Sequence, residues 1–269
     1  MSERAWILLP SGKQLDLLDP DPWAWSDDDV AIGLSRTYRW AGYSAWDLPL
    51  SVAQHSLAVL ALRRSRFAGR PLPVDEARRE LLHDATEALM GGWDPITPLK
   101  PHLGAGFSAL VARLQAAVDH RYDLPAWTPT DHALHKRADR LAAANEAYHV
   151  VGWSRAAMRE QLRIELDPLE YDPLDLPPDQ RAWEPWGGRL ERAKTYASVL
   201  HAMLRVRLAS IWRSAGEECL QPQFQVASLH DAVDGALAEF GGQGEDIGGH
   251  LAEVVVLLFQ PIKFLPLPG

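Results

Sequence analysis

The chain has 269 residues, 47% of them hydrophobic, which is enough to bury a sizeable core in one large domain or two small ones. Lys and Arg number 27 against 36 Asp and Glu, so the net charge is −9, which argues against a broad nucleic-acid footprint and an anionic membrane. A single cysteine, Cys219, excludes an intrachain disulfide, and we interpret it as structural. No stretch has the apolar length of a signal peptide or a membrane span, so we expect a cytoplasmic protein.

Residues 1–25 are expected to be extended, with turns at 10–12 and 19–22 that allow a hairpin. Ser26 precedes three aspartates, and this predicts a helix N-terminus, because a serine cap and acidic residues both stabilise the positive end of the helix dipole. The helices predicted in this half cover residues 27–40, 52–66 after a cap at Ser51, and 76–90 after a start at Asp75, the last ended by Gly91 and Gly92.

The second half of the chain is also predicted to be helical. A loop rich in Pro and Gly covers residues 93–106, and an irregular, acidic segment covers 166–188. The predicted helices lie at residues 107–122, 131–150 after a cap at Thr130, 154–165, 188–214, 227–240 and 246–260. Because alternating strand patterns are scarce throughout, we assign the chain to the all-α class.

Four side chains on three predicted helices are candidate metal ligands: His55, His83, Asp84 and Asp139. Each lies in a stretch that is otherwise apolar or rich in alanine. Imidazole together with carboxylate suits a divalent ion such as Zn²⁺, Mn²⁺, Co²⁺ or Mg²⁺. Four protein ligands on a six-coordinate ion leave two positions for water and substrate, which is the open site that a hydrolase needs.

Further charged residues could complete such a site. Glu87 follows His83 by four residues and Asp84 by three, so helix geometry puts it on the same face, where it could exchange a proton with the reacting groups. Arg39 could bind a phosphate through its guanidinium, and Lys100 could add a point charge. The blander alternatives are an ion pair between Arg39 and one of residues 27–29, and a solvated Lys100.

The chain has other histidines that could be ligands. His132 and His135 lie three residues apart, with Asp139 four residues after the second, and His102 and His120 are looser candidates. We interpret all four of these histidines as surface residues.

Three longer motifs are more specific than the spacings of single residues. They are "SVAQHS" at 51–56, "LLHDATEALMGGWDPITPLK" at 81–100 and "KRADRLAAANEA" at 136–147. With the Arg39–Trp40 pair that precedes them, they resemble the HD-domain metal-dependent phosphohydrolase superfamily, in particular its phage-type and bacterial members related to 5′-deoxynucleotidases. The resemblance is good over residues 11–150 and weak through 215. It implies an HD-domain helical bundle at 1–215 with an extended N-terminal segment. Residues 216–269 resemble nothing recognised, but the apolar stretch "IGGHLAEVVVLLF" predicts a C-terminal helical extension that packs on the core or forms a homodimer interface.

The same resemblance implies roles for individual residues. His55, His83, Asp84 and Asp139 would bind the metal. Glu87 would be the catalytic carboxylate, and Asp94 would lie near the attacking water if the two-residue insertion around Gly92 and Trp93 is placed before it. Arg39 would contact a phosphate and Trp40 would line the nucleoside pocket. We expect one tight metal site and leave a second ion open.

The function expected from this resemblance is release of phosphate from (deoxy)nucleoside 5′-monophosphates by attack of a metal-bound hydroxide. The alternatives are hydrolysis of (deoxy)nucleoside triphosphates, hydrolysis of a signalling nucleotide, and an HD scaffold module without turnover. The expected partner is a single small nucleotide, whereas the acidic balance speaks against long nucleic acids and membranes.

Overall fold

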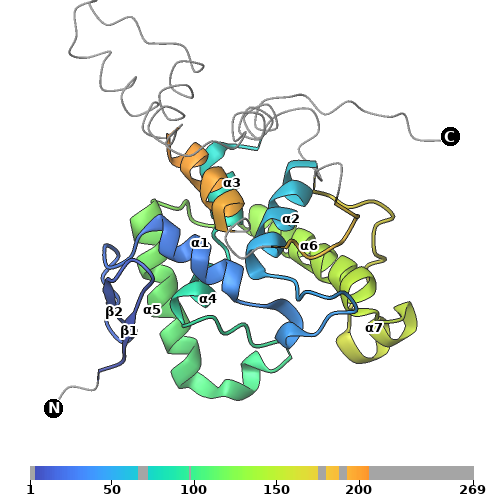
Figure 1. The fold of residues 1–269 in the computed structure, drawn as a ribbon, viewed down its shortest axis with the longest axis horizontal. Helices are drawn as coiled ribbons and strands as arrows, with labels where there is room; N and C mark the ends of the chain where they lie inside the picture. Colours follow the sequence, from blue (N-terminus) through green and yellow to red (C-terminus); the bar gives the residue numbers. More distant parts are fainter. Residues whose placement is uncertain (1–3, 66–71, 97, 175–179, 188–192, 206–269) are drawn as a thin grey trace, which may run out of the picture. The chain divides into compact units, whose positions relative to one another are not determined.

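Helices make up most of the computed structural model, as the sequence predicts, and a short hairpin precedes them (Figure 1). The structure describes residues 4–65, 72–96, 98–174, 180–187 and 193–205. In the hairpin, β1 (Trp6–Leu8) pairs antiparallel with β2 (Gln14–Asp16), so that Ile7 faces Leu15 across the strands. This confirms that the N-terminal segment is extended. Leu15 is fully buried and attaches the hairpin to the helical core.

Helix α1 (Asp27–Arg36) begins at the predicted cap. The Ser26 hydroxyl accepts a hydrogen bond from the Asp29 N–H, and the Asp29 carboxylate accepts one from the Ser26 N–H, which is a capping box. Asp29 also accepts a hydrogen bond from the Ser11 N–H at 2.8 Å. One carboxylate therefore fixes both the start of the helix and the turn of the hairpin.

The prediction that this helix continues to residue 40 was wrong. It ends at Arg36 because Thr37 has extended backbone (φ −83°, ψ 127°), while the N–H and the hydroxyl of Thr37 both donate to the Gly33 carbonyl at 2.9 Å each. The chain then enters the short helix η1 (Arg39–Gly42), in which Trp40 has a positive φ of 56°. A non-glycine residue in this left-handed region is strained, and such strain is concentrated at functional sites.

The single helix predicted for residues 76–90 is in fact two helices, α3 (Val74–Leu81) and α4 (Ala85–Leu89), with a turn between them. The prediction was therefore wrong in placing His83 and Asp84 in the middle of a helix. A continuous helix would bond the Asp84 N–H to the Glu80 carbonyl, but His83 Nδ1 lies 2.7 Å from that oxygen and donates to it instead. The start also differs, since α3 begins directly after Pro73, one residue before Asp75.

Four of the remaining helices and helical turns fall within a few residues of the predicted ranges. They are α2 (Val52–Ser65), α5 (Gly104–Tyr122), α6 (Pro129–Asn145) with the π-helical turn η3 (Glu146–Val151), and α7 (Arg155–Leu162). The short helix η2 (Lys100–Leu103) was not predicted, because it lies in the segment 93–106 that was expected to be a loop. The cap of α6 is Thr128 and not Thr130, because Thr128 Oγ1 accepts from the Asp131 N–H and Pro129 suits the first helical position.

The core lies where these helices cross. Helix α2 packs against α1, α3 and α6, and α4 packs against α1 and α5 (Figure 1). Residues 193–205 are helical, within the predicted range 188–214, and the buried Tyr196 hydroxyl donates to the Leu81 carbonyl at 2.7 Å. Cys219, the domain boundary at 215–216 and the predicted helices at 227–240 and 246–260 lie outside the described residues.

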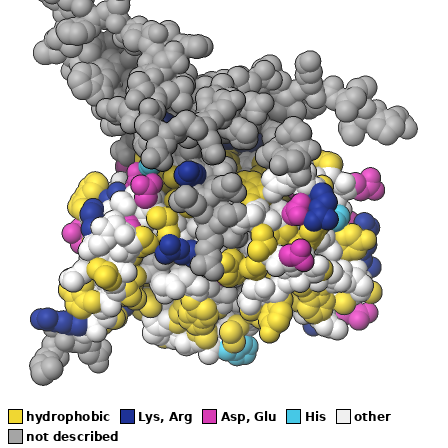
Figure 2. Space-filling model, viewed as in Figure 1, with side chains coloured by type: hydrophobic (Ala, Val, Ile, Leu, Met, Phe, Trp, Pro, Cys, Tyr) yellow, Lys and Arg dark blue, Asp and Glu magenta, His cyan; other side chains and the backbone are white. Residues whose placement is uncertain are grey.

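Two surface properties bear on possible partners. Among the described residues, no helix combines the length and the apolar character needed to cross a bilayer. Figure 2 shows Lys and Arg side chains interspersed with Asp and Glu side chains over the face in view, rather than gathered into one basic patch.

Candidate metal centre

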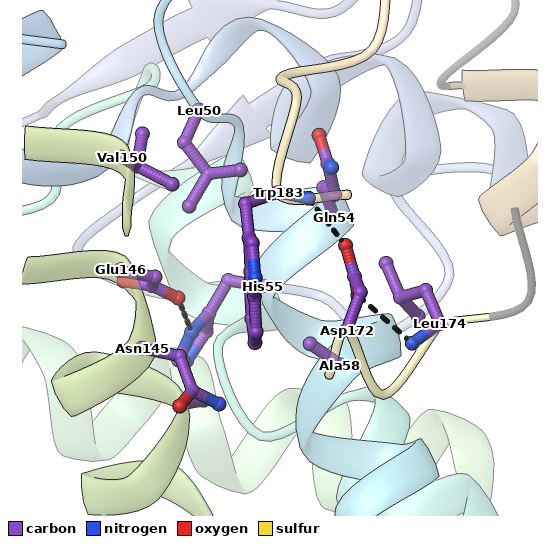
Figure 3. A pocket seen from close by; sticks show the side chains of 11 residues that line it. Leu50, Gln54, His55, Ala58, Asn145, Glu146, Val150, Asp172, Leu174 and Trp183 are labelled. Atoms are coloured by element: carbon purple, nitrogen blue, oxygen red, sulfur yellow. Dashed lines mark hydrogen bonds and ion pairs between the residues drawn. The ribbon is translucent and has the colours of Figure 1, made fainter. Parts of the chain in front are cut away.

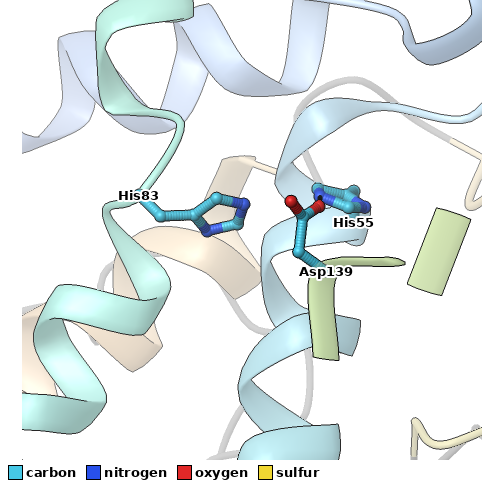
Figure 4. Close-up of side chains that lie close together, drawn as sticks. All are labelled: His55, His83 and Asp139. Carbon is cyan, nitrogen blue, oxygen red and sulfur yellow. Dashed lines mark ion pairs between the residues drawn. The ribbon is translucent and has the colours of Figure 1, made fainter. Parts of the chain in front are cut away.

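Three separate elements bring His55, His83 and Asp139 together (Figure 4). His55 comes from α2, His83 from the turn between α3 and α4, and Asp139 from α6. One ligand atom of each residue lies within 4.8 Å of those of the other two. Because α2 packs against both α3 and α6, residues far apart in the chain meet at one point. Imidazole nitrogens and a carboxylate oxygen at this spacing form a group that could hold one divalent cation.

Asp84 adjoins this group. Its Oδ2 atom lies 3.1 Å from His83 Nε2 and 3.6 Å from His55 Nε2. Asp139 Oδ1 lies 3.4 Å from His55 Nε2. The four residues that the sequence singles out as ligands therefore lie in one cluster around His55, and the turn that interrupts the predicted helix directs both His83 and Asp84 toward α2.

The hydrogen bonds of the two histidines leave the same ring atom available for a cation. His55 Nδ1 lies 2.5 Å from Glu146 Oε1 and His83 Nδ1 lies 2.7 Å from the Glu80 carbonyl, and since both partners are acceptors, each Nδ1 is the donor. The Nε2 atoms of both rings are buried, and among the described residues neither has a partner with the geometry of a hydrogen bond. Two such nitrogens facing two carboxylates are the arrangement expected where histidines bind a metal through Nε2.

The carboxylates control the protonation of this group. Burial and the Arg39 charge oppose ionisation of His55, but Glu146 and Asp139 outweigh them and raise the pKa of His55 to about 10. Burial also acts to raise the pKa of Asp84, but the neighbouring His83 and His55 outweigh it and hold that pKa far below its usual range. Without a cation, the cluster therefore balances its acidic groups with protons on the imidazoles.

A second set of charged residues lies beside the cluster. Glu87 is 3% exposed, its Oε1 atom accepts a hydrogen bond from Lys100 at 3.3 Å, and its Oε2 atom makes none among the described residues. Burial, followed by the charges of Asp84 and Asp94, raises the pKa of Glu87 to about 9. A carboxyl group that keeps its proton at neutral pH is suited to general acid chemistry. The Lys100 side chain, for which solvation was the alternative, is 41% exposed but makes this hydrogen bond.

Arg39 lies between two buried carboxylates and not beside the aspartates at the start of α1. Its Nη1 atom is 3.0 Å from Asp94 Oδ2, and its Nε atom is 3.2 Å from Glu146 Oε2. The half-buried Trp40 donates from its indole nitrogen to the same Glu146 oxygen at 2.9 Å. Asp94 is also 4.0 Å from Lys100, which places it in the same charged set as Glu87. The alternative of an Arg39 pair with residues 27–29 is excluded by this geometry.

The prediction that all four extra histidines are surface residues was wrong for His135. It is 3% exposed, its Nδ1 atom lies 2.7 Å from the buried Glu80 carboxylate, and its ring stacks on Trp127 with centroids 4.7 Å apart. Its ring also contacts that of His83, at 4.9 Å between centroids. The cause is its position four residues before Asp139, which puts it on the same inward face of α6. His102, His120 and His132 are exposed, as predicted.

Sequence reasoning missed Glu146, which contacts three of the predicted site residues. Its signal is present in the sequence: it follows Asp139 by seven residues, or about two helical turns, and so falls on the same face. It also belongs to the third motif, whose aspartate alone was singled out.

A small pocket shares His55 and Glu146 with the site (Figure 3). Its wall includes Trp183, whose ring stacks parallel to that of His149 at 4.3 Å between centroids. The backbone N–H of Trp183 donates to the Asp172 carboxylate at 2.6 Å. The pocket leaves about 30 Å³ for water, which suits one or two water molecules and not a nucleotide.

These features define a mainly α-helical protein with a His/Asp group suited to a divalent cation. The chain is similar to an uncharacterized protein of Rhodobacter capsulatus, with 42% identity over 158 residues that span 57% of this chain and 77% of that relative. The chain belongs to the family of that protein. No family model matches it.

Proposed function

We propose that the protein is an HD-type, metal-dependent phosphohydrolase that acts on nucleotides, with (deoxy)nucleoside 5′-monophosphates as the favoured substrates. The observation that carries this proposal is the convergence of His55, His83 and Asp139, with Asp84 beside them, next to a buried Glu87 that holds a proton. A purely structural cluster of ion pairs would not need a neutral, buried carboxyl group beside it.

The donor set fits a cation of the Mn²⁺, Co²⁺, Mg²⁺ or Zn²⁺ class, held by His55, His83 and Asp139 together with Asp84. When bound, such an ion supplies a Lewis acid that activates water and offsets the charge of phosphoryl oxygens. The residues around it would then hold the substrate and manage its protons.

Two cationic side chains, Arg39 and Lys100, would bind the phosphate. Arg39 is fixed through Nη1 and Nε, so its guanidinium has a defined plane, and its Nη2 atom makes no hydrogen bond among the described residues. A fixed guanidinium matches the geometry of phosphate oxygens. Lys100 contacts Glu87 and is more exposed than Arg39, so it would add positive charge beside the site. Trp40, next to Arg39, would contact the nucleoside.

Glu87 would supply the proton. In the metal-free protein its carboxyl group is neutral at pH 7, because its pKa is raised to about 9 by burial and by Asp84 and Asp94. Hydrolysis of a 5′-monophosphate leaves a nucleoside alkoxide, which needs a proton to depart. A neutral buried carboxyl group can donate that proton, and general acid help of this kind contributes about 10²–10⁴-fold to rate.

A phosphate-release screen tests this function. The purified full chain is incubated with deoxynucleoside and ribonucleoside mono- and triphosphates, each with Mn²⁺, Co²⁺, Mg²⁺ or Zn²⁺, beside the His83→Ala variant. We expect release of inorganic phosphate from monophosphates by the wild type and none by the variant. Release of triphosphate from nucleoside triphosphates would move the proposal to that substrate class. No release from any nucleotide with any of the four ions would overturn it.

A further inference from the structure

Glu146 contacts both the cation ligand His55 and the pair Arg39–Trp40. Its Oε1 atom lies 2.5 Å from His55 Nδ1, the ring atom opposite the one that faces the cation ligands. Its Oε2 atom accepts from Trp40 Nε1 at 2.9 Å and from Arg39 Nε at 3.2 Å. The residue is 5% exposed, so water does not compete for either oxygen.

Only a carboxylate satisfies this set of partners. Three N–H groups, on His55, Arg39 and Trp40, converge from two sides, and a carboxylate can accept on both oxygens. Glutamine, the nearest isostere, has one accepting oxygen and one NH₂ group. Whichever way its amide is turned, the NH₂ group faces a donor, so one side of the arrangement is lost.

The backbone explains how one residue reaches both sides. Glu146 is the first residue of the π-helical turn η3, which continues directly from α6, the helix that carries Asp139. Arg39 and Trp40 come from η1, where Trp40 has its strained positive φ. The bond from the Trp40 indole to Glu146 is one of the contacts that hold η1 in this conformation.

We propose that Glu146 is a positioning residue that holds the cation ligand His55 and the phosphate-binding pair Arg39–Trp40 in a fixed relation, so that loss of this carboxylate weakens both cation and phosphate binding. It acts through these residues and does not itself touch the reacting groups. The part that concerns phosphate rests on the proposed function. The part that concerns the cation rests only on the cluster around His55.

Two affinities measured by calorimetry on the full chain test this inference. The first is the affinity of the metal-free protein for Mn²⁺, and the second is the affinity for inorganic phosphate at saturating Mn²⁺. For Glu146→Gln we expect Mn²⁺ binding to weaken roughly 10–100-fold, as is typical when the carboxylate partner of a ligating histidine is lost. We expect phosphate binding to weaken by about 10-fold, the effect of one lost charge-assisted contact.

A matched control is Trp40→Phe, which removes one donor from the phosphate side and leaves the bond between Glu146 and His55. Its Mn²⁺ affinity should stay within about threefold of the wild type while phosphate binding weakens. If Glu146→Gln leaves either affinity within twofold of the wild type, the inference is overturned. If that variant does not fold, Glu146→Asp, which keeps both accepting oxygens on a shorter stem, is judged by the same rule with a threshold of threefold.

The two proposals can fail separately. Wild-type protein that binds Mn²⁺ and phosphate but hydrolyses no nucleotide would overturn the hydrolase function and leave the role of Glu146 to be decided by the two affinities. A hydrolase whose Glu146→Gln variant keeps both affinities would overturn only the role of Glu146.

Discussion

Lys100 Nζ lies 3.3 Å from Glu87 Oε1, while the other oxygen of this buried carboxyl group is without a hydrogen bond in the described part of the chain. In this carboxyl group, Oε1 is held in place by Lys100, and Oε2 is the oxygen that can carry the proton. Glu87 lies outside the His/Asp group, so we predict that Glu87→Gln keeps the cation and loses turnover by about 10²–10⁴-fold, the usual contribution of a general acid. Elemental analysis and initial rates on the same preparation measure both. An active Glu87→Gln enzyme would remove Glu87 from the mechanism.

The stability of the metal-free protein should fall as pH rises from about 5 to 9. Folding raises the pKa of Glu87 from 4.5 to about 9, so within that window the folded protein holds a proton that the unfolded chain has released, and rising pH favours unfolding. His55, raised from 6.5 to about 10, acts in the same direction at the upper end. Urea unfolding in EDTA at several pH values measures this.

The variant Glu87→Gln isolates the contribution of Glu87 to this slope. Glutamine does not titrate, so the loss of stability between pH 5 and 9 should shrink by at least about 1.4 kcal/mol, the equivalent of one pKa unit. A variant whose pH profile runs parallel to that of the wild type would show that Glu87 is ionised throughout and would contradict its assignment as the acid.

Cation binding should strengthen with pH. Since the pKa of His55 is raised to about 10, its Nε2 atom carries a proton at pH 7, and a cation must displace it before that nitrogen can act as a ligand. We predict that Mn²⁺ affinity rises by up to about tenfold per pH unit between pH 6 and 8, as expected for one displaced proton. Calorimetry in buffers of different ionisation enthalpy counts the protons released, and a count of zero would contradict the prediction.

Removal of a predicted ligand should abolish binding, whereas a nearby exposed histidine should not matter. We predict that His83→Ala weakens Mn²⁺ binding by more than roughly 100-fold, since even the loss of an outer partner costs roughly 10–100-fold. His132→Ala, on the same helix as Asp139 but exposed, is the matched control and should bind as the wild type does. Equal Mn²⁺ affinity in the two variants would exclude His83 as a ligand.

Part of this site could be predicted from the sequence because two of its ligands, His55 and Asp139, lie in regular helices. His55 and Asp139 are polar residues in apolar or alanine-rich helices, and such exceptions are visible in one dimension. The break at residues 82–84 could not be predicted, since it depends on a side chain that replaces a backbone donor: His83 Nδ1 occupies the carbonyl of Glu80. A helix-period pattern contains no sign of that competition.

Contacts that depend on tertiary packing could not be predicted from the sequence either. Arg39 has acidic neighbours ten residues before it in the sequence, but its partners are Asp94 and Glu146, which are 55 and 107 residues away. The spacing of His135 and Asp139 places both on one face of their helix, but only the packing shows that Glu80 and Trp127 cover His135. Hydrophobic periodicity and capping residues predict where helices begin and end, whereas side-chain contacts across the core depend on how those helices pack.

Close packing at Gly33 connects α1 to α4, the helix that carries Glu87. A Cβ atom at this position would lie 2.6 Å from the Cβ of Ala88, the neighbour of Glu87 on α4, so a side chain would push the two helices apart. We predict that Gly33→Ala destabilises the protein by about 1–3 kcal/mol, the usual cost of overpacking, and lowers turnover more than Mn²⁺ affinity because it moves Glu87.

Gly106→Ala is the matched control, since nothing lies within 4 Å of its Cβ position. Alanine in a helix is more stabilising than glycine by about 0.5–1 kcal/mol, so this variant should be at least as stable as the wild type. Chemical unfolding and steady-state rates of both variants measure the effect, and equal stability of Gly33→Ala and the wild type would show that α1 and α4 are free to separate without cost.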